Sequence, residues 1–249
     1  MCECEIFSRP SWVRYWVSVA PLLMSLSLAF LSLAADPSPG WLSYAVFEAA
    51  ANDTITSLSA TMSVPAKVKG FGSDPAFWFG VQTHKGDGAL IQPIQAKWLD
   101  GNWHMFHEIF DWTTMQDSAT AHYTVRPGDS IWAQVTYKPS DNSYDMDMKS
   151  AATGQRVRFN YKLNPLQTAP EATAYFVLEH QPAECGQLPP DGKVTWSNIS
   201  VEVNGAVVAD PKFVAKQENP VCGSKVEVVS PSVITLTWNP AEVEATATA

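Results

Sequence analysis

ATAYFVLEH, at residues 172–180, is the stretch from which the fold can be inferred. The four residues from Tyr175 to Leu178 favour strands and form an unbroken apolar run. Glu179 closes that run on the same alternating face as Tyr175 and Val177. This carboxylate marks either the point where a strand emerges into water or an acid held at a functional position. The rest of the chain is needed to choose between these two interpretations.

Similar segments recur on both sides of this stretch, with turn residues between them. No helical periodicity of useful length follows residue 40, and strands do not alternate with helices. The segments expected as strands or hairpins are 54–64, 77–83, 89–99, 102–112, 122–137, 144–163, 173–179, 193–203 and 232–238. About ten short strands of this kind predict an all-β, antiparallel fold, either a sandwich or a barrel.

The composition bounds the class of protein. The chain has 249 residues and a formal net charge of −9 at pH 7, without a basic patch, which argues against a nucleic-acid partner. No internal repeat and no linker divides it, so residues 35–238 are expected to form a single domain. Residues 239–249 are small and polar, which predicts a disordered tail.

The N-terminus carries a targeting pattern. Arg9 and Arg14 precede an uncharged stretch at 15–35, and SLA at 32–34 has the small-x-small form of a signal-peptidase site. We therefore predict that residues 1–34 are a signal peptide and that the protein is secreted to the extracellular space, with no membrane attachment after cleavage. The alternative is a signal anchor, because an uncharged stretch of this length can nearly span a bilayer.

The cysteines fit an oxidising compartment. Cleavage would remove Cys2 and Cys4 and leave Cys185 and Cys222 as an even pair. This pair predicts one disulfide. The alternative, two reduced thiols that bind a metal, lacks any neighbouring Cys or His at a suitable spacing.

Two Asn-x-Ser/Thr triplets are candidate glycosylation sites. They begin at Asn52 and Asn198. Such triplets are acceptors only in secreted chains and also occur by chance.

Searches for familiar catalytic and metal motifs fail. The chain has no G-x-S-x-G elbow, no Walker loop and no dinucleotide-binding glycine pattern. His104 and His107 lie near Glu108, but on a strand the two histidines have opposite parity and point to opposite faces. We therefore expect no metal site and no cofactor.

Strand parity sorts the polar residues into sets. Gln92 shares a face with Leu90 and Ile94, and Glu108 shares one with Phe106 and His104. In the same way, Gln82 shares a strand face with Trp78 and Gly80. Each set contains a polar group among apolar or aromatic neighbours. These groups either face solvent on half-buried strands or converge on one site.

Seven short motifs, in order, resemble those of the eqolisins, the glutamic peptidase family. They are WFGV at 78–81, ALIQ ending at Gln92, FHE ending at Glu108, GDSI at 128–131, TGQ with a following valine at 153–157, the strand closed by Glu179, and VTWSN at 194–198. The resemblance spans Trp41 to Val203. It implies a two-sheet antiparallel β-sandwich of the concanavalin-like jelly-roll type.

The resemblance also implies an activity. Gln92 and Glu179 match the family's catalytic pair, so the resemblance implies an acid-active endopeptidase that hydrolyses polypeptides with an activated water. Glu108 would tune Glu179, and Trp78 and Phe106 would line the substrate cleft. A monomer is expected.

The sequence departs from the family pattern at a few positions. Gln82 stands where the family has an acid, and Pro93 follows the matched glutamine. His180 replaces the acid after the matched glutamate.

Two alternatives remain at this point. A non-catalytic eqolisin-like protein would keep the sandwich and bind another protein. A lectin-like sandwich would bind carbohydrate, with tryptophans as stacking platforms. The eight tryptophans after the signal peptide are at 41, 78, 98, 103, 112, 132, 196 and 238.

Overall fold

The computed structural model describes residues 40–68, 75–167, 169–181, 183, 185–219 and 221–241. The predicted signal peptide and the tail from residue 242 lie outside these ranges. Asn239, which the sequence assigned to the tail, donates its backbone N–H to the Cys222 carbonyl at 2.7 Å. Among the described residues, no helix is both long and apolar enough to cross a membrane.

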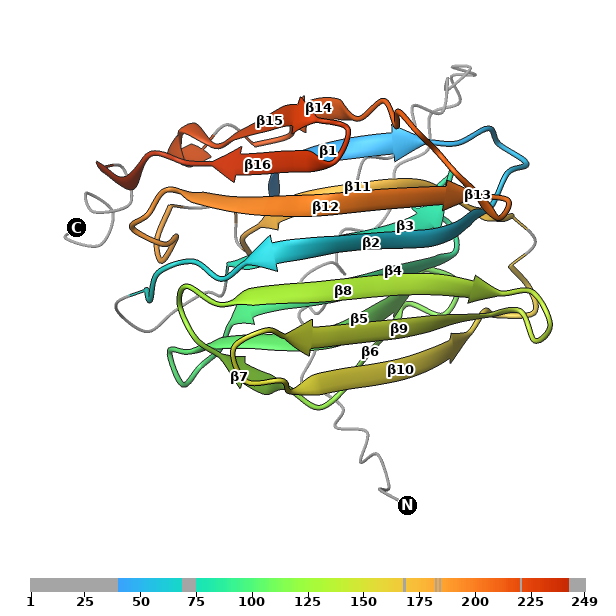
Figure 1. Cartoon of the computed structure of the whole chain (residues 1–249), viewed down its shortest axis with the longest axis horizontal. Helices are drawn as coiled ribbons and strands as arrows, with labels where there is room; N and C mark the ends of the chain where they lie inside the picture. Colours follow the sequence, from blue (N-terminus) through green and yellow to red (C-terminus); the bar gives the residue numbers. More distant parts are fainter. Residues whose placement is uncertain are drawn as a thin grey trace, which may run out of the picture.

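The protein is a sandwich of two antiparallel sheets, as predicted (Figure 1). Sheet A has the strand order β14-β1-β11-β3-β4-β5-β6, with β7 also paired to β5. Its strands are β1 (Trp41–Glu48), β3 (Ala76–Thr83), β4 (Ala89–Lys97), β5 (Trp103–Asp111), β6 (Gln116–Ala119), β7 (Tyr123–Val125), β11 (Glu171–Glu179) and β14 (Val214–Gln217).

Sheet B lies against sheet A and has the order β10-β9-β8-β2-β12-β16-β15, with β13 also paired to β12 (Figure 1). Its strands are β2 (Ile55–Ser63), β8 (Ser130–Lys138), β9 (Ser143–Ser150), β10 (Arg156–Lys162), β12 (Lys193–Val203), β13 (Ala206–Val207), β15 (Lys225–Ser230) and β16 (Val233–Thr237). A short 3-10 helix, η1 (Val221–Gly223), precedes β15.

The main core lies between the two sheets. Phe79 and Phe176 of sheet A stack with ring centroids 5.5 Å apart, and Trp196 of sheet B meets Phe176 edge-on at 5.8 Å. All three side chains are fully buried. Burial of such large apolar groups is the dominant favourable contribution to folding, so this layer fixes how the sheets pack.

Every segment expected from the sequence contains a strand, but the hairpin expected over residues 122–137 is wrong, because β7 pairs with β5 in sheet A and β8 pairs with β2 and β9 in sheet B. Several further strands were not anticipated. β1 is buried on both faces and lacks a clean alternation of polar and apolar residues. β14 is exposed throughout, and β15 alternates only between exposed and half-buried positions. Exposed edge strands such as β14 and β15 have too few buried apolar residues for their alternation to be recognised in the sequence.

The predicted disulfide between Cys185 and Cys222 is confirmed, with Cα atoms 5.1 Å apart. Both candidate glycosylation residues are exposed. Asn52 lies in the turn before β2, and Asn198 lies at a break in the β12–β2 register with φ of 53°. Glycosylation of either residue stays a prediction.

Candidate active site

A second apolar cluster lies on the face of sheet A that is turned away from sheet B. Its buried members all come from sheet A: Trp41, Tyr44, Val46, Trp78, Leu90, Ile94, Ala96, Phe106, Tyr175 and Val177. The intervening residues of the same strands, such as Phe77 and Phe79, belong to the core between the sheets. The parity sets predicted from the sequence are therefore correct, and the site residues proposed on strands β3, β4, β5 and β11 share this outer face.

Glu179 lies at the end of β11, where two donors hold its carboxyl. The indole Nε1 of Trp78 donates to Oε2 at 2.8 Å, and the amide Nε2 of Gln181 donates to Oε1 at 3.1 Å. Burial raises the pKa of Glu179, while the bonds from Gln181 and Trp78 and the charge of His180 oppose that rise. The strand end is thus a held acid and not a side chain that simply enters water.

The backbone around Glu179 leaves room for Gln181. A Cβ at Gly40 would lie 2.3 Å from the Gln181 Cδ, so a side chain at position 40 would displace the Gln181 amide from this position. The carbonyl of Gly40 also accepts a hydrogen bond from the His180 N–H at 2.8 Å. The His180 ring is buried and contacts the carbonyl of Gly186, next to Cys185. The departure at His180 therefore has a structural use.

Gln92 lies on β4 and contacts Glu108 on β5. The two residues are direct cross-strand partners, and the Gln92 Nε2 donates to the Glu108 Oε1 at 3.3 Å. A carboxylate accepts only, so this contact points the NH2 end of the amide toward Glu108. The sequence expectation was that Glu108 tunes Glu179; the contact observed here is with Gln92.

Pro93 and Gly80 give β3 and β4 an unusual junction next to Gln92. The β3–β4 pairing runs from Ala76 to Trp78 and resumes only at Val81, which leaves the segment opposite Pro93 unpaired. A Cβ at Gly80 would lie 2.3 Å from the Ile91 carbonyl oxygen. The proline therefore removes a ladder donor, and the glycine lets the two backbones approach closely.

Strand order places Glu179 and Gln92 on either side of β3. Trp78 on β3 pairs with Val177 on β11 and with Ile94 on β4. The indole that donates to Glu179 thus stands on the strand between the acid and the amide. The catalytic roles of these residues stay predictions.

Phe106 and Gln82 also lie on the outer face. The Phe106 ring stacks on His122, with centroids 4.1 Å apart and planes inclined by 2°, and Trp98 meets the same imidazole edge-on at 4.2 Å. Gln82 is buried opposite Thr173, beside the turn at Gly86. His122 and Gln181 were not singled out from the sequence, because His122 lies just before β7 and Gln181 lies two residues after β11, where strand parity does not sort side chains.

The two histidines that resembled a metal cluster lie on opposite faces, as parity predicted. The His107 Nε2 contacts the Val157 carbonyl of sheet B at 3.2 Å, and burial lowers its pKa to about 4. His104 contacts Asp100 at 2.9 Å. Within the described ranges, no three His, Cys, Asp or Glu residues are grouped in a way that could hold a metal ion.

The tryptophans do not form an exposed platform. Trp103, Trp196 and Trp238 fill the core between the sheets, and Trp41 and Trp78 are buried in the outer cluster. Trp132, at 36% exposure, is the most open tryptophan among the large apolar residues found exposed in the described chain. This distribution gives the lectin alternative no support.

A held carboxyl and an oriented amide on one face of a β-sandwich are the groups expected of a metal-independent hydrolase. A carboxyl can act first as a base and then as an acid, and an amide N–H can stabilise an oxyanion. The comparisons with known proteins agree with this class.

The model of the peptidase A4 family matches residues 42–238. Two crystal structures of scytalido-glutamic peptidase, each with a transition-state analogue, superpose with TM-scores of 0.60 and 0.59 at 18% identity. SCP-B, a member of the eqolisin family in complex with the tripeptide Ala-Ile-His, superposes with a TM-score of 0.56 at 19% identity. Each match covers 80% of this chain and 98% of the other.

No curated protein has a sequence that matches this chain. The structural matches establish the shared fold, and the family model covers most of the chain. The chain belongs to the peptidase A4 family, and it is a glutamic-type peptidase.

Proposed function

We propose that the protein is a secreted, acid-active endopeptidase in which Glu179 and Gln92 hydrolyse peptide bonds with an activated water. The observation that carries the proposal is the setting of Glu179. Each carboxyl oxygen receives one donor, burial raises the pKa, and the same sheet face presents Gln92. A polypeptide substrate is supported by similarity to SCP-B, whose structure holds a tripeptide.

The proposed reaction needs no metal and no covalent intermediate. Glu179 takes a proton from water while the water oxygen bonds to the carbonyl carbon of the peptide. The Gln92 N–H donates to the oxyanion that develops on the carbonyl oxygen. Glu179 then returns the proton to the leaving nitrogen as the C–N bond breaks. Glu108 would position Gln92 by holding the NH2 end of its amide.

The raised pKa of Glu179 sets the acid side of the pH profile. A general base must be ionised, so activity should rise with pH through the pKa of Glu179. Because that pKa lies above the ordinary value of 4.5, half-maximal activity on the acid side is expected above pH 4.5. Below that point Glu179 is protonated and cannot accept the proton of the water.

Secretion rests on the sequence pattern at the N-terminus. If SLA at 32–34 is the cleavage site, the secreted protein begins at Ala35. N-terminal sequencing of protein recovered from the medium of a eukaryotic host tests this. A protein retained in the membrane fraction with its N-terminus intact would contradict it. Gel filtration of the same material tests the expected monomer.

The activity test is cleavage of a denatured protein from about pH 2 to about pH 7, with an inhibitor of aspartic peptidases present. Cuts within the substrate, mapped by mass spectrometry and abolished by Glu179→Gln, support the proposal. A folded wild-type protein that cleaves nothing across this range would leave the non-catalytic alternative, with its changes at Gln82 and Pro93, as the correct one.

A further inference from the structure

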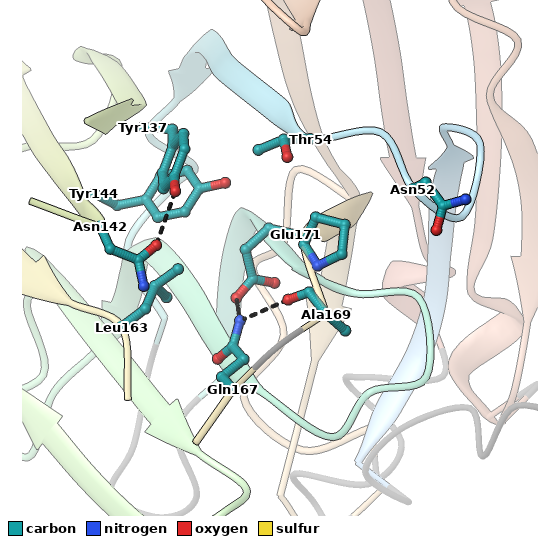
Figure 2. Close-up of a pocket in the computed structure, with 10 residues that line it drawn as sticks. Asn52, Thr54, Tyr137, Asn142, Tyr144, Leu163, Gln167, Ala169 and Glu171 are labelled. Atoms are coloured by element: carbon teal, nitrogen blue, oxygen red, sulfur yellow. Dashed lines mark hydrogen bonds between the residues drawn. The ribbon is translucent and has the colours of Figure 1, made fainter. Parts of the chain in front are cut away.

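A pocket of about 450 Å³ has Glu171 in its lining; Figure 2 shows the residues around it. Glu171 begins β11 and Glu179 ends it, so the pocket lies at the opposite end of this strand from Glu179. Its lining comes from the turn before β2, the β8–β9 hairpin and the segment that leads into β11. The volume is typical of sites for small molecules. Asn52 and Asn142 at its rim are exposed, while Tyr144 and Glu171 are buried, so the pocket descends from the surface toward the core.

Glu171 brings a carboxyl to the base of this pocket. A shift in the β11–β3 register between Glu171 and Thr173 removes Glu171 from the outer face that carries Glu179. Its side chain instead lines the pocket together with Tyr144 and Leu163, which belong to the core between the sheets. Glu171 is 1% exposed.

One oxygen of this carboxyl lacks a partner. The Gln167 Nε2 donates to Oε1 at 2.7 Å, whereas Oε2 has no hydrogen-bond partner among the described residues. A buried polar atom left in this state has lost its hydration without gaining a hydrogen bond in exchange. An occupant that satisfies Oε2 would therefore bind with that penalty relieved.

The surroundings of Glu171 favour the protonated form of its carboxyl. Burial raises its pKa to about 8, the Gln167 bond opposes that rise and the charge of Asp87 in the β3–β4 turn adds to it. The tyrosines Tyr144 and Tyr161 also interact electrostatically with Glu171. No Lys, Arg or His is among the residues that line the pocket. The ionised form of Glu171 therefore has no cationic partner among the residues that line the pocket, and a cationic ligand would supply one.

Two tyrosine rings make the pocket suitable for an organic cation. Tyr137 and Tyr144 lie with ring centroids 5.1 Å apart, and both line the pocket on the side across from Glu171 and Gln167 (Figure 2). Their hydroxyls donate elsewhere, Tyr137 to the Asn142 Oδ1 and Tyr144 to the Ile55 carbonyl. Aromatic rings attract ammonium groups and also bury the apolar body of a ligand.

We propose that this pocket binds a small organic cation, an ammonium group on an apolar body, whose charge pairs with Glu171. The proposal does not depend on the peptidase mechanism, because the pocket and Glu179 lie at opposite ends of β11. A bare metal ion fits less well, since within the described chain no cluster of three His, Cys, Asp or Glu side chains exists.

The test is calorimetric titration of the purified protein with benzylamine, beside its neutral analogue benzyl alcohol. Free Glu171 is protonated below about pH 8, and only its carboxylate pairs with the cation. Binding at about pH 7 should therefore release about one proton, measured by comparing buffers of different ionisation enthalpy, and affinity should fall about tenfold for each pH unit below that. Benzyl alcohol should bind about tenfold more weakly and release no proton.

Two variants separate the charge from the cavity. Glu171→Gln keeps the shape and should weaken benzylamine binding about tenfold and abolish proton release. Ala169→Trp should block the pocket while leaving the Glu171 carboxyl unchanged. Absence of saturable benzylamine binding, equal binding of benzyl alcohol, or an affinity that neither variant alters would each overturn the proposal.

Discussion

At the scale of single residues, the proposed activity depends on how the Glu179 carboxyl is held. Both donor bonds favour its ionised form, so removing either should raise its pKa further. We predict that Trp78→Phe and Gln181→Leu each move the acid limb of the kcat/KM profile to higher pH. The measurement is the pH dependence of peptide cleavage. Acid limbs that coincide with that of the wild type would show that these bonds do not set the protonation of Glu179.

Glu108 is predicted to act through Gln92. Without its carboxylate the amide can rotate, so Glu108→Ala should lower kcat by about tenfold to a hundredfold with a smaller change in KM. Glu108→Gln offers an acceptor at the same place and should retain more activity than the alanine variant. Equal losses in the two variants would point to charge, and not orientation, as the contribution of Glu108.

Single residues also show how much of the candidate site could be predicted from the sequence. Strand parity correctly placed Trp78, Gln92, Glu108 and Glu179 on one face, because parity depends only on spacing along each strand. The partners of these residues could not be inferred in the same way. Gln181 follows the end of a strand, and its contact with Glu179 depends on the space left by Gly40, a residue distant in the chain.

At the scale of elements, the junction of β3 and β4 positions Gln92 in the candidate site. The Ile91 carbonyl occupies the position that a Cβ at Gly80 would need, and backbone cannot move away as a side chain can. Gly80→Ala should therefore separate the strands beside Gln92 and destabilise the fold by about 1–3 kcal/mol. Urea denaturation measures this. An unchanged midpoint with full activity would mean that the strands tolerate the separation.

Strand boundaries could be predicted from the sequence where turn residues separate segments of alternating apolar and polar residues, as in β8 and β9. They did not follow for β14 and β15, whose exposed residues carry no apolar signal and which form by pairing with β1 and β16. The pocket at Glu171 was also beyond sequence reasoning. A single register shift turns that residue to the other face, and parity alone assigns it to the face of Glu179.

At the scale of the whole molecule, a buried carboxyl with a raised pKa makes the folded state more stable at low pH than at high pH. Burial raises the pKa of Glu171 to about 8, so its contribution is fully present below about pH 4.5 and is lost as pH rises toward 8. The loss amounts to at most ~1.4 kcal/mol per pH unit. His107 acts in the opposite direction, because its pKa is lowered to about 4 and its contribution is lost as pH falls from 6.5.

Glu171→Gln should therefore flatten the decline of the free energy of unfolding between about pH 4.5 and about pH 8. Denaturant titrations at a series of pH values measure this slope. Glu227→Gln, at an exposed position of β15, is the matched control and should leave the slope unchanged. A slope that persists in Glu171→Gln would show that Glu171 is not the group responsible.

The central claim is that Glu179 and Gln92 act together on one peptide bond. It is tested by kcat/KM for one peptide at mildly acidic pH, with wild type, Glu179→Gln, Gln92→Ala, the double variant and the Glu227→Gln control, each shown to be folded. We predict losses of about a hundredfold or more for each single variant, with the double variant no worse than Glu179→Gln alone. Wild-type activity in Glu179→Gln, or losses that multiply in the double variant, would contradict it.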